Sequence, residues 1–446
     1  MQGISNKTGL ILALALVVLV LYAGCGSSQV EKLSSLKKEN DELKVQLTTL
    51  NNRIGELQEK LGAGSAELEN VTKQLEQLKT ENEALAKNNT ELKGQNQLIE
   101  EKNTQLTEEL KPKPSRKVGR YAIVVSSPTS DTWSAVVKAL QEKYDETKVF
   151  TWSGSVNEVK DGLSSYQPKY TCFVCQWNEA NKSFVQTVHQ MTRELDSDPY
   201  GDTIWGILTG YDESDARRIA QYKGPLEVKY LLSGCGNQLD AFPEGVAFSE
   251  LADCTVWEKK KGGPITSKKC EPDTSPLIAE EMNNNKADVI VTSGHAQENV
   301  WGVKYNGPGA GKARLTSRDG KLTMTDMDGK SYPITTDRPK AYIAAGNCLF
   351  GNISDRNCIT LAWIHSGGVV QLVGYTVTTW YGFMGWGTWA RFQSGKYSLA
   401  EAFHETNRVL VDELVKGTAK DVKGHNYDKD VVAFYGDPAV EVKIAK

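Results

Sequence analysis

Two apolar runs of this 446-residue chain each end beside a side chain that can do chemistry. Val289 to Trp301 reads V-I-V-T-S-G-H-A-Q-E-N-V-W and places His295 just after a β-branched run. Ala341 to Gly346 reads A-Y-I-A-A-G and is followed by Asn347 and Cys348. Both runs predict buried strands, and neighbouring parallel strands of an open α/β sheet bring their carboxyl ends into one crevice. His295 and Cys348 are therefore a candidate base and thiolate nucleophile.

Taken alone, this pair leaves a simpler interpretation open. A histidine beyond a strand often serves as a capping residue, and a lone cysteine after an apolar run is often a small buried side chain. Segments elsewhere in the chain favour the catalytic interpretation.

Five segments in the second part of the chain resemble, in order, segments of the gingipain-type cysteine peptidases, which are relatives of the caspases. These segments are Asp202 to Tyr222, Ser293 to Gly302, the surroundings of Cys348, Gly374 to Trp380, and Phe434 to Val442. The resemblance implies a cysteine endopeptidase that needs no cofactor and acts on protein or peptide substrates.

The same resemblance implies a role for each site residue. Cys348 would attack the peptide carbonyl, and His295 would protonate the departing amine. The backbone N–H groups of Ala296 and Cys348 would hold the oxyanion. Asp202 matches the family's accessory carboxylate and would orient the imidazole ring.

Three further residues, Trp380, Ser293 and Gly346, are expected by this mapping to line the S1 pocket. The chain also departs from the family's pattern. Ala296 replaces a glycine, which keeps the oxyanion N–H but adds a methyl group to the site. Thr209 and Gly210 stand where the family has Gly-Arg.

The first 25 residues resemble a bacterial lipoprotein signal. An apolar run from Leu10 to Tyr22 follows Lys7, and small residues precede Cys25. An uncleaved transmembrane anchor is the alternative, but this run is short for a bilayer span of about 20 residues. We therefore expect lipidation of Cys25 and an extracytoplasmic location on a bacterial membrane, at its periplasmic face or at the cell surface.

A heptad pattern extends from Leu33 to Leu110. Its a positions are Leu33, Asn40, Leu47, Ile54, Leu61, Leu68, Leu75, Asn82, Asn89, Asn96, Asn103 and Leu110. Its d positions are Leu36, Leu43, Leu50, Leu57, Gly64, Val71, Leu78, Leu85, Leu92, Ile99 and Leu106. The 3.5-residue period predicts a coiled-coil stalk over residues 29–111, and asparagines at a favour a parallel homodimer. Such a stalk would reach about 120 Å, with a soft joint at residues 62–64, and prolines end it in a linker over residues 112–117.

Charge and cysteine content exclude some classes of function. The formal net charge is -4, and no basic stripe of the kind that nucleic-acid binding requires is present. Beside Cys25 and Cys348, six cysteines could form up to three disulfides in an oxidising compartment. They are Cys172, Cys175, Cys235, Cys254, Cys270 and Cys358. Only Cys172 and Cys175 have ligand-like spacing, without a second pair, so we expect no metal.

Strand and helix signals alternate over residues 118–446, which predicts one α/β peptidase domain. We expect a mainly parallel sheet with helices on both faces, as in caspases and gingipains. Residues 233–276 are rich in Gly, Pro, Lys and Cys without a sustained period, and we interpret them as an inserted loop region. Asp326-x-Asp328-Gly329 suggests calcium, but its spacing fits a hairpin turn better.

The sequence thus predicts a membrane-anchored cysteine endopeptidase that acts through a Cys-His dyad. Two alternatives stay open. The fold could serve as a stalked binding module with little or no catalysis, or the same machinery could transfer the acyl group to an amine. Cleavage specificity cannot be read from the chain.

Overall fold

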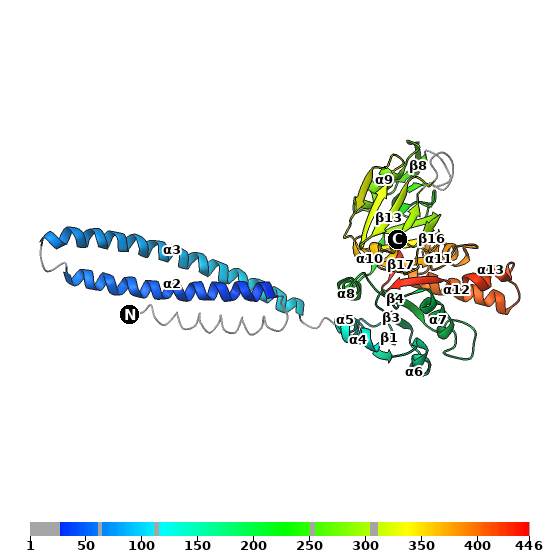
Figure 1. Ribbon diagram of the computed structural model, residues 1–446, viewed down its shortest axis with the longest axis horizontal. Coiled ribbons are helices and arrows are strands. Elements are labelled where there is room, and N and C mark those ends of the chain that lie inside the picture. Colours follow the sequence, from blue (N-terminus) through cyan, green and yellow to red (C-terminus); the bar gives the residue numbers. More distant parts are fainter. Residues whose placement is uncertain (1–26, 61–64, 111–115, 250–254, 304–310, 446) are drawn as a thin grey trace. The chain divides into compact units, whose positions relative to one another are not determined.

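The computed structural model describes residues 27–60, 65–110, 116–249, 255–303 and 311–445, in two compact units, Met1–Lys113 and Pro114–Lys446 (Figure 1). The predicted lipidation site Cys25, the joint at residues 62–64 and Cys254 lie outside the described residues. Among the helices described, none is both long enough and apolar enough to cross a membrane.

The first unit consists of two helices that pack on one another, α2 (Ser27–Lys60) and α3 (Ser65–Leu110). The contact is made by heptad residues: Leu57, Val71 and Leu78 form one buried cluster. The heptad therefore predicted the seam correctly. Within the single chain α2 packs on α3, and the parallel dimer stays a prediction.

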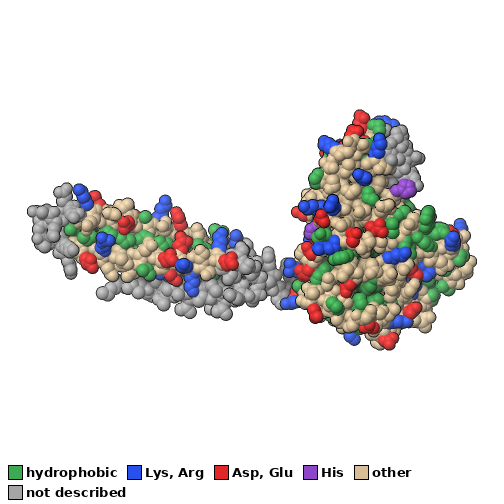
Figure 2. Space-filling view, viewed as in Figure 1, with side chains coloured by type: hydrophobic (Ala, Val, Ile, Leu, Met, Phe, Trp, Pro, Cys, Tyr) green, Lys and Arg blue, Asp and Glu red, His purple; other side chains and the backbone are tan. Residues whose placement is uncertain are grey.

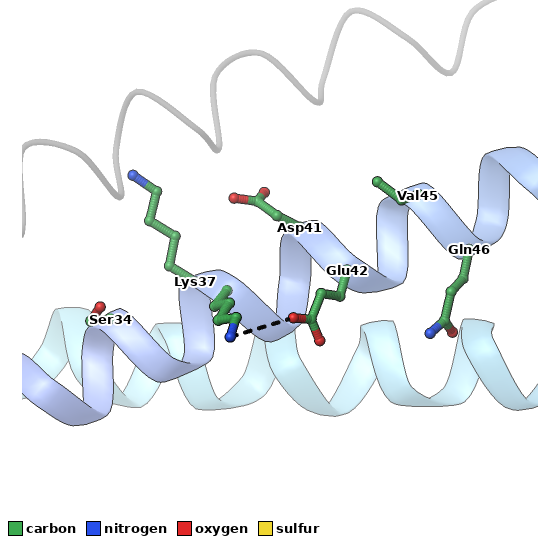
Figure 3. Close-up of a pocket in the computed structure, with 7 residues that line it drawn as sticks. Ser34, Lys37, Asp41, Glu42, Val45 and Gln46 are labelled. Carbon is green, nitrogen blue, oxygen red and sulfur yellow. Dashed lines mark ion pairs between the residues drawn. The ribbon is translucent and has the colours of Figure 1, made fainter.

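The exposed face of α2 is mainly polar, although it includes Val45, which is 67% exposed. Figure 3 shows part of it, where Lys38 and Glu42 form an ion pair of 3.9 Å one turn apart. A predicted parallel dimer would need the seam that α2 and α3 already bury, so the two arrangements exclude one another.

The second unit combines helices with a large mixed sheet. Its helices are α4 (Ser127–Thr132), α5 (Ser134–Lys143), the 3-10 helix η1 (Val156–Val159), α6 (Lys160–Tyr166), α7 (Lys182–Thr192), α8 (Glu213–Gln221), α9 (Ser275–Asn283), α10 (Ile359–His365), α11 (Phe383–Gln393), α12 (Leu399–Val415) and α13 (Val422–Asp428). Its strands are β1 (Tyr121–Ser126), β2 (Thr147–Trp152), β3 (Tyr170–Val174), β4 (Ile204–Leu208), β5 (Leu226–Val228), β6 (Tyr230–Ser233), β7 (Glu244–Phe248), β8 (Thr255–Lys259), β9 (Ile265–Lys269), β10 (Val289–Gly294), β11 (Ala296–Gln297), β12 (Val300–Gly302), β13 (Arg314–Arg318), β14 (Lys321–Thr325), β15 (Ser331–Ile334), β16 (Lys340–Asn347), β17 (Val369–Tyr375), β18 (Val432–Gly436) and β19 (Val442–Ile444).

The main sheet has the strand order β2-β1-β3-β4-β18-β17-β16-β10-β6-β7-β8-β9. Most neighbours run parallel, as predicted, but β18 is antiparallel to β17 and the edge strands β8 and β9 are antiparallel too. Alternate side chains of β1 belong to two buried clusters, one with α5 and α8, the other with α6 and α7. Helices therefore cover both faces, as expected for an α/β fold.

Residues 233–276 are not the loop region that we predicted. They contain β7, β8 and β9, which extend the main sheet beyond β6. Strands this short and this exposed carry little periodic signal, since only β7 is largely buried. Three of the six cysteines that could have formed disulfides, Cys172, Cys175 and Cys358, are free buried thiols.

A second sheet follows His295 in the chain, with the antiparallel order β11-β12-β13-β14-β15. The hairpin between β14 and β15 turns at Asp328 and Gly329, as predicted. Oδ1 of Asp326 accepts the N–H groups of Asp328 (3.0 Å) and Lys330 (2.8 Å), which is turn chemistry.

Asp437, which follows β18 in the F-Y-G-D-P segment, ties the ends of the second unit together. Its buried carboxylate accepts hydrogen bonds from the hydroxyls of Tyr121 (2.9 Å) and Tyr144 (2.7 Å) and pairs with Nζ of Lys143 (2.7 Å).

On the face in view in Figure 2, acidic and basic side chains are mixed over the second unit.

Candidate active site

The register of β10 and β16 brings the two predicted catalytic residues to adjacent strand ends. These strands are parallel neighbours, and Gly294 is paired with Asn347. His295 directly follows β10, and Cys348 directly follows β16. His295 is exposed and Cys348 is half-buried, so both can be reached from solvent.

A buried polar network holds these two strand ends together. The hydroxyl of Thr292 donates to Oδ1 of Asn347 (2.7 Å), and Nδ2 of Asn347 donates to the carbonyl of Gly294 (3.4 Å). Because the single hydroxyl hydrogen of Thr292 goes to Asn347, the 2.9 Å contact with Tyr342 must be donated by the tyrosine. Thr292, Tyr342 and Asn347 are fully buried, so the network fixes the backbone directly before both catalytic candidates.

The sulfur of Cys348 accepts a hydrogen bond from the backbone N–H of Thr379 (3.3 Å). This contact fixes the position of the sulfur relative to the segment that follows β17. The next residue, Leu349, has a left-handed backbone with φ 55° and is held there by its N–H bond to the carbonyl of Val377 (2.9 Å). Such a conformation is costly for leucine, and backbone strain of this kind is typical of functional sites.

The hairpin of β11 and β12 shapes the other side of the site. The indole N–H of buried Trp301 donates to the carbonyl of Ser293 (2.8 Å), and the N–H of Gly302 donates to the carbonyl of His295 (2.8 Å). Pairs alternate along an antiparallel ladder, which makes Ala296 and Trp301 a non-hydrogen-bonded pair. The N–H of Ala296 therefore points away from β12, as an oxyanion donor must.

The side chains predicted to line the S1 pocket are only partly together. A Cβ at Gly346 would collide with Oγ of Ser293 and would lie 3.2 Å from Nε1 of Trp386. Gly346 and Ser293 are thus neighbours beneath a tryptophan. That tryptophan is Trp386 on α11, whereas the predicted Trp380 is 72% exposed in the loop before it.

Sequence reasoning missed Trp386. The run T-W-Y-G-F-M-G-W-G-T-W after β17 offers three tryptophans, and spacing cannot rank them. The contact depends on Gly385, because a Cβ there would collide with the carbonyl of Ala345. Only a helix that approaches β16 this closely brings Trp386 over Gly346.

The structure does not bring Asp202 to His295. Asp202 precedes β4, which lies four strands from β10, or about 19 Å at about 4.8 Å per strand. Its Oδ2 accepts the N–H of Leu195 (3.0 Å), and burial and the carboxylate of Asp196 raise its pKa to about 6. Carboxylate oxygens of Asp196, Asp198 and Asp202 lie within 4.8 Å of one another.

The other buried cysteines contrast with Cys348. Burial raises the pKa of Cys172 and Cys175 well above the usual value, and that of Cys358 to about 12. Thiols of this kind stay protonated and are poor nucleophiles. Cys348, half-buried and with a donor on its sulfur, is a better candidate than these three.

Comparison with known proteins agrees with this site. Residues 251–443 match the model of peptidase family C25. The second unit carries a gingipain-like cysteine peptidase domain. The C25 match includes His295 and Cys348 but begins after Asp202.

The chain is also similar to a solved structure, described as the Arg-specific cysteine proteinase gingipain R. The identity is 13% and the TM-score 0.46, over 73% of this chain and 78% of that chain. No curated protein matches the chain by sequence.

Proposed function

We propose that this chain is a cysteine endopeptidase in which Cys348 is the nucleophile and His295 the acid-base partner. The pairing of Gly294 with Asn347 carries this proposal, because it delivers both side chains from adjacent strands. The match to peptidase family C25 supports it at the level of the family.

The reaction would begin with the Cys348 thiolate, whose sulfur the N–H of Thr379 holds in place. Its sulfur attacks the peptide carbonyl carbon, and the carbonyl oxygen becomes an oxyanion held by the N–H groups of Ala296 and Cys348. His295 gives a proton to the leaving amine, which departs and leaves a thioester. Water, activated by His295, then cleaves the thioester and restores the thiolate.

Ser293, Gly346 and Trp386 would wall the pocket for the residue on the acyl side of the scissile bond. Trp380 is exposed and would meet substrate from the rim of the site. Asp202 is left without a role in this mechanism because of its distance from β10.

The activity is tested with a mixed peptide library and a thiol-reactive chloromethyl ketone probe. Cys348→Ala is expected to lose all turnover and labelling while its unfolding curve is unchanged. His295→Ala is expected to lower kcat about 100- to 10,000-fold, because the leaving amine is then poorly protonated. Cys358→Ala is the control and should keep labelling.

Two other results would replace this proposal. Full cleavage by Cys348→Ala would show that the activity lies elsewhere, and no labelling of the wild type would favour a stalked binding module. Transfer of the acyl group to an added amine, with little hydrolysis, would identify an acyl transferase with the same residues.

We also propose that the enzyme is held outside the cytoplasm by a lipid on Cys25. The signal-like segment that ends in Cys25 supports this location. Cys25→Ala should abolish incorporation of labelled fatty acid and release or stall the protein. An unlabelled wild type that stays in the membrane would instead indicate an uncleaved anchor.

A further inference from the structure

A cavity of about 430 Å³ is lined by Leu349, the residue that directly follows Cys348. Its apolar floor is formed by Leu349, Val377 and Val431. The helix α7 contributes Lys182, Gln186 and Gln190 to the lining, and α13 contributes Asn426 and Tyr427.

Three contacts link the residues that line this cavity to the surroundings of Cys348. Leu349 directly follows the nucleophile, and its N–H bonds to Val377 (2.9 Å). The hydroxyl of Tyr427 donates to the carbonyl of Thr378 (2.8 Å), one residue before the N–H that binds the Cys348 sulfur. Burial raises the pKa of Tyr427, and the nearby Asp428 and Cys348 raise it further.

The cavity and the pocket beneath Trp386 lie on different sides of Cys348. Gly346 and Ser293 lie near the ends of the neighbouring strands β16 and β10. Val377 follows β17, and Val431 directly precedes β18, which lies on the other side of β17 from β16. A peptide with its acyl side between Gly346 and Ser293 would therefore run over Cys348 and place its leaving side in this cavity.

The α7 wall is a row of hydrogen-bond donors. Lys182, Gln186 and Gln190 are spaced by four residues, so they share one face of the helix. The ammonium of Lys182 is a cation, and both glutamines offer amide N–H groups.

The one carboxylate in the lining is already paired. Asp430 binds Nη2 of Arg193 (2.5 Å) and Nζ of Lys429 (2.9 Å), which leaves the cavity with an excess of positive charge. An apolar floor with cationic and amide donors above it suits a side chain that has an aliphatic stem and ends in oxygen acceptors.

We infer that this cavity is the subsite for the leaving side of the substrate and that it takes a glutamate there in preference to a lysine. The inference rests on the proposed peptidase function, since it assigns Cys348 as the attacking group. It adds a substrate class that the catalytic residues do not define.

The test uses the full chain and two kinds of substrate. Quenched peptide libraries are randomised on the acyl side and carry either Glu or Lys at the first two leaving-side positions. A second set has the same acyl sides but ends in a small aminocoumarin amide, which cannot reach the cavity. Wild type is expected to cleave the Glu library about 1.5-fold to fivefold faster than the Lys library, the range that one exposed ion pair supports.

Lys182→Glu is expected to remove or reverse this preference and to leave cleavage of the coumarin amides unchanged. Lys138→Glu is the matched control, an exposed lysine on α5 outside the cavity lining, and should keep the wild-type preference. A preference that is absent in wild type, or that survives Lys182→Glu, would overturn the subsite. Loss of coumarin-amide cleavage in Cys348→Ala tests the peptidase function separately.

The subsite can also be tested without turnover. Short peptides that represent the leaving side, with Glu or Lys at their first two positions, are titrated against Cys348→Ala protein. Tighter binding of the Glu peptide that Lys182→Glu abolishes supports the subsite. Equal binding of both peptides refutes it.

Discussion

Replacing Thr292 by valine tests whether the buried network under the catalytic candidates holds the site. Valine keeps the shape of threonine but removes the hydroxyl, so it leaves two buried groups without their partner: Oδ1 of Asn347 and the hydroxyl of Tyr342. Each such group costs about 1–3 kcal/mol. After allowance for the better burial of a methyl group, we expect a net loss of about 2–4 kcal/mol in the free energy of unfolding.

Thr209→Val is a matched control for this change. Thr209 is as fully buried as Thr292, but its hydroxyl has no hydrogen-bond partner within the described residues. Replacing an unpaired hydroxyl by a methyl group is expected to be neutral or to stabilise by about 1 kcal/mol. The same substitution should therefore have opposite signs at the two positions.

The two variants are compared by urea unfolding and by peptide cleavage. Thr292→Val should also lower kcat about tenfold with little change in KM, because Asn347 no longer fixes the strand ends before His295 and Cys348. Thr209→Val should keep wild-type kcat. Equal losses of stability in the two variants would refute the reasoning, since burial alone would then explain both.

Further perturbations test other parts of the structure. Trp301→Phe keeps the ring but loses the bond to the carbonyl of Ser293, so kcat should fall several-fold while binding of the chloromethyl ketone probe persists; an unchanged kcat would show that this bond does not position the site. Burial raises the pKa of Asp202 to about 6, so the folded state favours its protonated form and loses stability as pH rises through 6. Asp202→Asn should therefore melt higher than wild type at pH 8 and equally at pH 3.5, and a lower melting temperature at pH 8 would contradict this. Asp437→Asn leaves a buried lysine without its counter-charge and should cost about 3–5 kcal/mol in urea unfolding; a loss below about 1 kcal/mol would show that the cluster is not a tie. A fragment of residues 27–110 should sediment as a monomer if α2 and α3 satisfy the seam within one chain, whereas a two-chain rod would restore the parallel dimer.

Local patterns in the sequence were enough to find the elements that carry the site. The runs before His295 and Cys348 form β10 and β16 as parallel neighbours, because uninterrupted apolar, β-branched segments are stable mainly as buried strands. The hairpin turn at Asp328 and Gly329 was also predicted correctly, since it depends on residues that are close together in the sequence.

Long-range pairing decided what those patterns could not. The sequence alone determined which segments are buried and where His295 and Cys348 follow their strands, because the patterns that predict burial and turns involve residues close together in the sequence. Only the tertiary structure placed β18 and β17 between β4 and β16, and so separated Asp202 from the site, or folded α3 back on α2. The sequence of a strand or of a heptad seam shows that the segment needs a partner but not which segment that partner is. The packing of the whole chain selects the partner.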